Sequence, residues 1–468
     1  MKGNLQKSLL LFFALVMTAG HWACGTKPLP RATPRERVSE RKRPLYPLSA
    51  DTISRVKIET PTSPAEPPLA RREPLPLPRR SGNIIASLDR IPVRSLPQKN
   101  VTPTTGELTF QQNARGEREA VYRLKKGEAL YSAVVVRFTG RIEADEVNAI
   151  AKKILDYNGI RDETKIAAGT RIRIPASVLD EEVALDKTPP AIEKISPTPR
   201  VQRFRRSELQ VILDAGHGGN DPGTIVRGWA EDEIAYDLML RIKLGLQARG
   251  IKVYSTVRDK KTGDQVNNGS LLTNNREEYV KVTPEYYMED SRIALNLRIY
   301  LIEDLYRWML RQGISPENII LLSIHLDHLH ASVSGAMIYF PGAAERTAQY
   351  QASGNIYRYY KESKFGAITF RRSEMADAED VSRLFALDLI DSFRGANIPI
   401  HDYKPIRRYV YRQDSKWTPG IIRYSRVPIS ILLEASNLSN RDDLWRIRSA
   451  NFRQRLADAV VETIVAQK

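Results

Sequence analysis

The stretch Leu209-Gln-Val-Ile-Leu-Asp-Ala-Gly-His-Gly-Gly-Asn-Asp-Pro-Gly223 joins an apolar run to a glycine-rich turn and decides the fold. Residues 209–213 are apolar apart from Gln210, and this length suits a strand that is buried on both faces. Glycines on both sides of His217 let the backbone turn sharply and leave the imidazole open to a ligand. The stretch therefore predicts a buried strand that ends in a functional turn.

Downstream of this turn, apolar strands alternate with amphipathic helices. The expected strands are 251–257, 319–324, 336–340 and 429–433, and the expected helices are 234–246, 293–310, 381–393 and 452–465. This alternation is typical of the α/β class, with a mixed, largely parallel sheet flanked by helices. In open α/β sheets, ligand sites lie at the carboxyl ends of the strands.

Polar side chains stand at three of these strand ends. His217 follows the first strand, His325 ends the strand that contains Ser323 and Ile324, and Glu434 ends the strand 429–433. Glu231 stands where the first helix begins. Two histidines and one glutamate, with room for water, form a common catalytic zinc set, and a further glutamate can serve as the base.

These residues resemble the zinc-dependent N-acetylmuramoyl-L-alanine amidases. The resemblance is carried by 211–223, by Glu231, by 323–325 with Asp327, and by Glu434 with 438–440. It implies that His217, Glu231 and His325 bind Zn2+ and that Glu434 is the catalytic carboxylate. The amide bond between N-acetylmuramic acid and the L-alanine of the stem peptide would be cleaved by zinc-activated water, with Glu434 moving the proton from the water to the leaving amine.

Each candidate residue also has a simpler interpretation. His217 could cap a turn, Glu231 could favour a helix start through the dipole, and Glu434 could be a buried ion-pair partner. Glu233 could bind the metal in place of Glu231. His328 or His330 could bind it in place of His325, although neither follows the strand directly.

A long segment, 341–376, separates His325 from Glu434 along the chain. Its polar composition and the tyrosines at 357, 359 and 360 suggest a surface element that could fold back over a cleft. Some amidases of the family use an inserted helix whose glutamate reaches the zinc, so Glu374 is the candidate gate residue and Glu362 the alternative. A protein activator would then be a possible partner. The simpler interpretation is a surface loop without a gating role.

The first hundred residues differ in composition from the rest. They are rich in Pro and Arg and contribute much of the net charge of +17, as expected of an extended basic tether attracted to anionic surfaces. Nucleic acid is the rival partner, but the basic residues alternate with Pro rather than with aromatic residues, which argues against it.

The N-terminus reads as an export signal. Lys2 and Lys7 precede an apolar stretch, 9–19, and the only cysteine of the chain, Cys24, follows soon after. This arrangement resembles a bacterial lipoprotein signal, in which Cys24 receives the lipid. The alternative is ordinary signal cleavage with Cys24 incidental. Either way the protein is expected in the periplasm or cell envelope, and lipidation would anchor it to the membrane.

A small unit between two Pro-rich stretches resembles the LysM family of glycan-binding modules. The resemblance rests on Tyr122, Gly127, 130–131, 158–160, 169–170 and 174–175, and it implies a βααβ fold that binds peptidoglycan. A βααβ spacer without a ligand is the alternative. The expected domains are a signal at 1–24, a linker at 25–118, the LysM-like module at 119–176, a second linker at 177–206 and the amidase domain at 207–468.

The sequence thus predicts an exported peptidoglycan amidase. Two rival functions remain open: a zinc peptidase or deacylase that acts on another amide, and a wall-binding lipoprotein without catalytic activity. The full set of His217, Glu231, His325 and Glu434 argues against the inactive protein.

Overall fold

The computed structural model describes residues 107–184, 208–269, 271–412 and 415–467. The signal with Cys24 and nearly all of the expected first linker lie outside these residues, as do the residues 185–207. Within the described ranges, no helix combines the length and the apolar character needed to cross a membrane.

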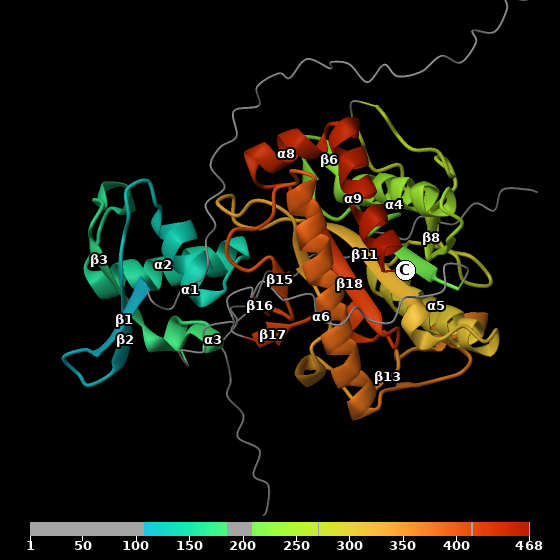
Figure 1. Cartoon of the computed structure of the whole chain (residues 1–468), viewed down its shortest axis with the longest axis horizontal. Coiled ribbons are helices and arrows are strands. Elements are labelled where there is room, and N and C mark those ends of the chain that lie inside the picture. Colours follow the sequence, from blue (N-terminus) through green and yellow to red (C-terminus); the bar gives the residue numbers. More distant parts are fainter. Residues whose placement is uncertain (1–106, 185–207, 270, 413–414, 468) are drawn as a thin grey trace, which may run out of the picture. The chain divides into compact units, whose positions relative to one another are not determined.

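A six-stranded sheet forms the centre of the larger unit, which spans 208–467 (Figure 1). Its strand order is β15-β12-β18-β11-β4-β7. Neighbouring strands are parallel except β12 and β18, so the sheet is mixed and largely parallel, as the sequence predicted. The strands are β4 (Gln210–Ala215), β7 (Lys252–Ser255), β11 (Ile319–Asp327), β12 (Met337–Tyr339), β15 (Ile406–Arg407) and β18 (Ile429–Asn437).

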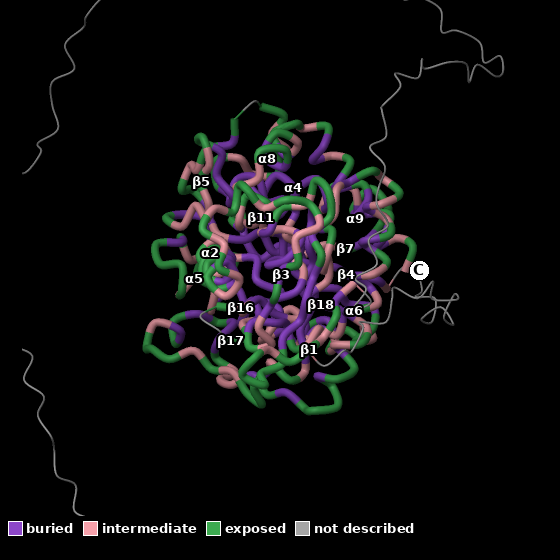
Figure 2. The backbone as a smooth tube through the Cα atoms, turned by 90° about the vertical axis from the view of Figure 1, so that its left-hand side faces the viewer, coloured by how far each residue is buried: buried purple, intermediate pink, exposed green. Residues whose placement is uncertain are grey.

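The three central strands are buried along almost their whole length. Every residue of β4 is buried, and only His325 and Asp327 of β11 and Glu434 of β18 are partly exposed. Figure 2 colours the buried residues, among them those of β4, β11 and β18, purple. A parallel sheet covered on both faces requires such continuous apolar strands. The partly exposed residues are the ones singled out from the sequence.

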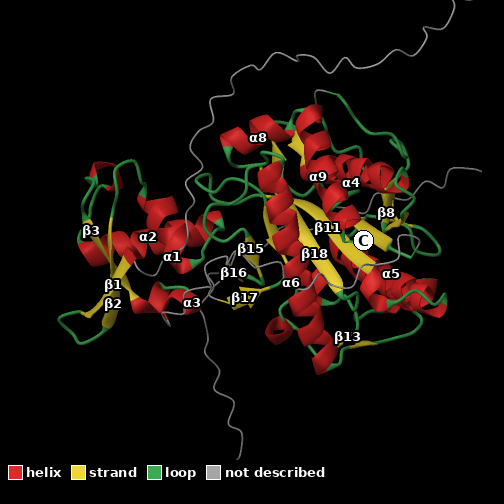
Figure 3. Cartoon of the chain, viewed as in Figure 1, coloured by secondary structure: helices red, strands yellow, loops and turns green. Residues whose placement is uncertain are grey.

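Helices flank the sheet (Figure 3). They are α4 (Glu231–Gln247), α5 (Ser291–Arg311), α6 (Arg372–Gly395), α8 (Arg441–Ile447) and α9 (Ala450–Ala466). The chain passes from β4 through α4 to β7, and then back through α5 to β11 on the other side of β4. Because parallel crossovers are right-handed, α4 and α5 lie on opposite faces of the sheet.

The expected helices and strands of the larger unit are all present, with different ends. Helix α6 begins at Arg372 rather than at residue 381, and β11 and β18 extend past their expected ends to Asp327 and Asn437. The short elements were not predicted, because two to four residues carry no periodicity. They are β5 (Ile225–Val226), β6 (Trp229–Ala230), β8 (Val257–Asp259), β9 (Glu278–Val280), β10 (Tyr286–Tyr287), β13 (Gln349–Tyr350), β14 (Ile368–Thr369), β16 (Val410–Arg412), β17 (Ser415–Trp417) and α7 (Gly420–Arg423).

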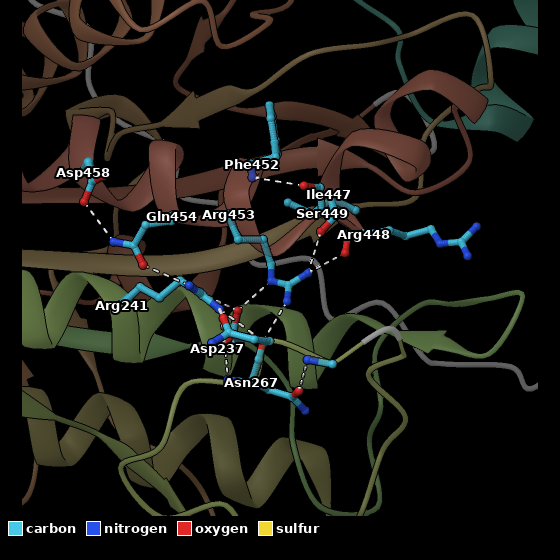
Figure 4. Close-up of polar contacts among 12 residues, drawn as sticks. Asp237, Arg241, Asn267, Ile447, Arg448, Ser449, Phe452, Arg453, Gln454 and Asp458 are labelled. Atoms are coloured by element: carbon cyan, nitrogen blue, oxygen red, sulfur yellow. Dashed lines mark hydrogen bonds and ion pairs between the residues drawn. The ribbon is translucent and has the colours of Figure 1, made fainter. Parts of the chain in front are cut away.

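A buried ionic network joins α4 to α9 (Figure 4). The Asp237 carboxylate accepts hydrogen bonds from Arg241 Nε at 2.8 Å and from Arg453 Nε at 2.6 Å. Arg453 is fully buried, and its remaining donors bond to the carbonyls of Ile447, Arg448 and Asn267. Since each buried charge has a partner, the network holds the two helices in one arrangement.

The small unit has a three-stranded antiparallel sheet with the order β1-β2-β3. Its strands are β1 (Leu108–Gln112), β2 (Arg118–Arg123) and β3 (Arg171–Pro175). Between β2 and β3 lie a π-helical turn at Tyr131–Val136 that continues into α1 (Arg137–Thr139), and then α2 (Ala144–Asn158). The elements expected for a βααβ unit are therefore present.

Two boundaries of this unit differ from the expected ones. Strand β1 lies inside the expected linker 25–118, because a turn at Asn113 pairs it with β2: the Asn113 side chain accepts from the backbone N–H groups of Arg115 and Glu117. Similarly, a 3₁₀ turn at Ala176–Val178 and α3 (Glu181–Ala184) extend past residue 177, where the second linker was expected.

Candidate metal and catalytic site

The three expected metal ligands converge at the carboxyl edge of the sheet. His217 follows β4, Glu231 is the first residue of α4, and His325 lies near the end of β11. One ligand atom from each lies within 4.8 Å of the others. Glu231 Oε1 stands between the two imidazoles, 3.1 Å from His217 Nε2 and 3.3 Å from His325 Nδ1.

A strained backbone and a second carboxylate orient His217. Its φ of 59° lies in the left-handed region, which a non-glycine residue adopts only when its surroundings hold it there. The Asp221 carboxylate lies 3.1 Å from His217 Nδ1, and its other oxygen accepts from Gly223 N at 3.1 Å. A carboxylate on the second ring nitrogen is the usual device that leaves the first nitrogen facing a metal.

Backbone groups hold the Glu231 carboxylate in place. Its Oε2 accepts from Thr224 N at 3.0 Å, and its Oε1 accepts from Leu326 N at 3.2 Å. The side chain is 5 % exposed. The loop before α4 and the strand β11 therefore fix the carboxylate between the two histidines before any ligand binds.

Two glycines leave the room that these side chains occupy. A Cβ at Gly216 would lie 2.2 Å from the His325 ring, and a Cβ at Gly223 would lie 2.6 Å from Glu231 Oε2. Both distances are far below van der Waals contact. The glycines of 209–223 therefore leave space for the ligand side chains and also allow the turn.

The charges in the cluster depend on one another. Burial would lower the pKa of His217, but the Glu231 and Asp221 carboxylates raise it to about 10. Burial would raise the pKa of Glu231, but the two histidines lower it well below its usual range. Burial lowers the pKa of His325. The Glu231 carboxylate is therefore a buried anion that requires positive charge beside it.

Glu434 lies next to this cluster. It is the parallel register partner of His325 on the neighbouring strand, so both side chains leave the sheet at the same level. Burial, and then the charges of Asp327 and Glu231, raise its pKa well above the ordinary value. Its Oε2 is buried and has no hydrogen-bond partner among the described residues. A carboxyl group in this state can accept or hold a proton.

The cluster fits a zinc ion by its donor chemistry. Two imidazole nitrogens and one carboxylate oxygen are a known catalytic zinc set, and three protein ligands leave a position open for water. The buried Glu231 carboxylate and the space that Gly216 leaves for the His325 ring also fit a metal ion between these side chains. Among the described residues, the alternative ligands do not join this cluster.

Each alternative ligand lies elsewhere. Glu233 belongs to a second carboxylate cluster with Asp259 and Glu278. His328 is exposed, and His330 Nδ1 lies 2.8 Å from Ser332 Oγ.

Glu374 is held away from the cluster. It lies in the first turn of α6, 3.8 Å from Arg371 and 3.9 Å from Arg426. Arg426 comes shortly before Ile429, the first residue of β18. Glu434 lies further along the same strand. At the usual rise per residue, Ile429 and Glu434 are on the order of 17 Å apart. The alternative, Glu362, is buried and accepts from Thr283 N and Oγ1.

The segment 341–376 lies at the surface, as expected, with many exposed residues, and a few buried side chains anchor it to the rest of the unit. Tyr357 and Tyr360 are 7 % exposed, and only Tyr359 of the three tyrosines points into solvent. The Arg346 guanidinium donates to the carbonyls of Arg423 and Ser425, just before β18. The polar composition of the segment did not reveal this anchor, because the buried Arg346 side chain bonds to backbone carbonyls of residues distant in the sequence.

Two supporting groups were missed from the sequence. Asp221 belongs to the stretch 209–223, and its carboxylate orients His217. Asp214 is fully buried below the site, where it accepts from Ser323 Oγ at 2.7 Å and from Thr256 and lies 3.6 Å from Arg298. Asp214 stands directly before Ala215 and Gly216, and a charge inside an apolar strand was the available signal.

Fold and site together define an α/β protein with a histidine–carboxylate cluster that could hold a metal ion at the carboxyl edge of its sheet. A family model described as N-acetylmuramoyl-L-alanine amidase matches residues 211–466, more than half of the chain. The chain belongs to this family of amidases, which act on peptidoglycan.

Several solved structures are similar in fold. The N-acetylmuramyl-L-alanine amidase Ami1 from Mycobacterium smegmatis is 17% identical over 56% of this chain and 98% of its own, with a TM-score of 0.34. AmiC2 of Nostoc punctiforme is 16% identical over 55% and 96%, with a TM-score of 0.33. The catalytic domain of CwlV from Bacillus (Paenibacillus) polymyxa is 18% identical over 55% and 97%, with a TM-score of 0.33. No curated protein matches the chain.

Proposed function

We propose that this protein is a zinc-dependent amidase that cleaves the bond between N-acetylmuramic acid and the L-alanine of the stem peptide. The observation that carries the proposal is the convergence of His217, Glu231 and His325 beside Glu434. Membership of the amidase family supplies the substrate class.

His217, Glu231 and His325 would hold the zinc ion. When bound, zinc lowers the pKa of water toward about 7 and polarises the amide carbonyl. Asp221 keeps His217 in the orientation that binding requires, since it occupies the ring nitrogen that faces away from Glu231. Backbone donors at Thr224 and Leu326 keep Glu231 from turning out of the site.

Glu434 would be the proton carrier. Its unpartnered Oε2 accepts the proton of the attacking water and returns it to the departing amine. Burial, followed by the charges of Asp327 and Glu231, raises the pKa of Glu434, and a raised pKa favours uptake of a proton by this carboxylate.

The N-terminal part would place the enzyme at the wall. We propose that the signal at 1–24 exports the chain, that Cys24 carries the lipid, and that the basic linker spans the distance from the membrane. The LysM-like module would bind the glycan strand, and the strand–helix–helix–strand order of 118–175 supports this role.

The test is digestion of purified peptidoglycan followed by identification of the new chain ends. Free L-alanine amines support the amidase, whereas ends released within the stem peptide would favour a zinc peptidase. Intact wall, together with tight sedimentation of the protein, would favour an inactive binding protein. Zinc content is measured on the same sample, so that loss of the metal is separated from a different specificity.

A further inference from the structure

A second group of acidic side chains lies in the catalytic unit, apart from the His217–Glu231–His325 cluster. Glu233 belongs to the first turn of α4, Asp259 ends β8 and Glu278 begins β9. One carboxylate oxygen from each lies within 4.8 Å of the others. We propose that these three carboxylates form a binding site for a hard divalent cation, Ca2+ or Mg2+.

Burial makes this grouping costly without a cation. The three residues are 6 %, 0 % and 2 % exposed, respectively. No ion pair to a lysine or arginine is found for these three among the described residues, although the pKa of Glu233, which burial raises, is lowered somewhat by the charge of Lys261. Bringing three carboxylates together away from water is unfavourable unless they take up protons or bind a cation, and a divalent ion supplies opposite charge at one point.

An unused oxygen points to the same ligand. Glu278 Oε1 is buried and has no hydrogen-bond partner among the described residues. Asp232, the neighbour of Glu233 in α4, is 2 % exposed, and both of its carboxylate oxygens also lack partners in the described part of the chain. Buried polar atoms are almost always paired, so these free acceptor oxygens support the proposal of a cation beside them.

The remaining oxygens are held by backbone and amide donors. Asp259 Oδ1 accepts from Lys261 N and Thr262 N, and its Oδ2 accepts from Asn275 Nδ2 at 2.6 Å. Asn275 N donates to Glu233 Oε1 at 2.9 Å. These bonds fix the carboxylates in position, while each oxygen keeps a further lone pair for a metal.

The donor set selects the kind of metal. The site offers only oxygen ligands, which suit Ca2+ and Mg2+, whereas the two histidines of the other cluster suit zinc. Ca2+ accepts six to eight oxygens in flexible arrangements and Mg2+ requires an octahedron with several waters, so the two ions are separate arms of the test.

The site connects the segment 257–290 to the turn that carries His217. Glu278 Oε2 accepts from Gly219 N at 2.8 Å, and Asn274 Nδ2 donates to Gly219 O at 3.0 Å. Asn220 N in turn donates to Met288 O at 2.9 Å. A cation bound to Glu278 therefore stabilises the turn beside His217, although it contacts no ligand of the other cluster.

The experiment uses the full chain with its zinc content held constant. Protein stripped of Ca2+ and Mg2+ is titrated with each ion up to millimolar concentrations, the range of extracellular calcium sites, while bound metal and the melting temperature are followed. We expect one additional Ca2+ or Mg2+ per chain and a melting temperature that rises with the concentration of that ion.

Variants assign the ion to the site. Glu278→Gln should lose the additional ion and the rise in melting temperature but retain zinc, and Glu233→Gln serves as the second variant if the first fails to fold. Asp264→Asn, in the same segment but half-exposed and paired with Lys243, should keep both metals. Absence of additional metal in the wild-type protein, or unchanged binding in a folded Glu278→Gln or Glu233→Gln variant, would overturn the proposal. Neither readout depends on amidase activity.

Discussion

His325 and Glu434 are register partners on the adjacent parallel strands β11 and β18. Because side chains at the same level of a parallel sheet leave it on the same face, this pairing puts the proposed base beside a proposed metal ligand. The pairing of two buried strands, which is in register up to this pair and irregular directly beyond it, thus sets the distance between them rather than a flexible loop. Such rigidity is what proton transfer requires.

Glu434→Gln should retain zinc and lose most of its turnover. The amide is nearly the same size as the carboxylate but cannot take up a proton, so we expect a decrease in kcat of roughly 10²–10⁴-fold. Wall digestion and zinc content are measured on the same preparation. His217→Ala and His325→Ala are the comparison variants, and both should lose zinc and activity together. Near-normal digestion by the glutamine variant would exclude the role assigned to Glu434.

Gly216→Ala should disrupt the site without changing any polar group. The new Cβ would lie 2.2 Å from the His325 ring, which must therefore move. We expect weaker zinc binding and a loss of activity of the same order as for His325→Ala. Gly395→Ala is the matched control, because its Cβ meets no atom within 4 Å. Normal zinc binding by the Gly216 variant would contradict the predicted clash between the new Cβ and the His325 ring.

Asp237→Ala should strongly destabilise the larger unit. The substitution leaves Arg241 and the fully buried Arg453 without their carboxylate, and breaking a buried pair in this way costs about 3–5 kcal/mol. Chemical denaturation measures the loss. Asp458→Ala is the control, since Asp458 is exposed and accepts only from Gln454 in this network. Equal stability of the two variants would contradict the role of the network.

Glu374→Ala should leave basal activity within about twofold of the wild type, because surface ion pairs contribute little. Its side chain is 43 % exposed and lies beside Arg371 and Arg426, at the end of the sheet where β18 begins. Activity in the absence of any partner protein is the measurement. A large increase in the basal activity of this variant would instead support the prediction that Glu374 is a gate residue.

Cys24→Ser should release the protein from membranes and preserve its activity in solution. The thiol is the atom that a lipoprotein signal modifies, and the catalytic unit begins well beyond it. Membrane fractionation and the mass of the mature N-terminus are the two readouts. A wild-type N-terminus without lipid would refute the anchor and leave ordinary export.

The sequence by itself determined the fold class and the candidate ligands. Largely apolar runs such as 209–213 and 429–433 are buried completely only inside a sheet that is covered on both faces. Polar residues at the ends of such runs then lie at the edge of the sheet. His217, Glu231, His325 and Glu434 follow from this local pattern together with the resemblance to a family.

Only the tertiary structure decided which distant groups meet. It brought Asp259 and Glu278 to Glu233, oriented His217 with Asp221, and held Glu374 beside Arg426 at the opposite end of β18 from Glu434. The physical reason is that charge pairing and burial depend on distances across the sheet and between loops. Composition and periodicity report only on neighbours along the chain, so they could not show that buried side chains such as Arg346 and Tyr357 anchor the segment 341–376.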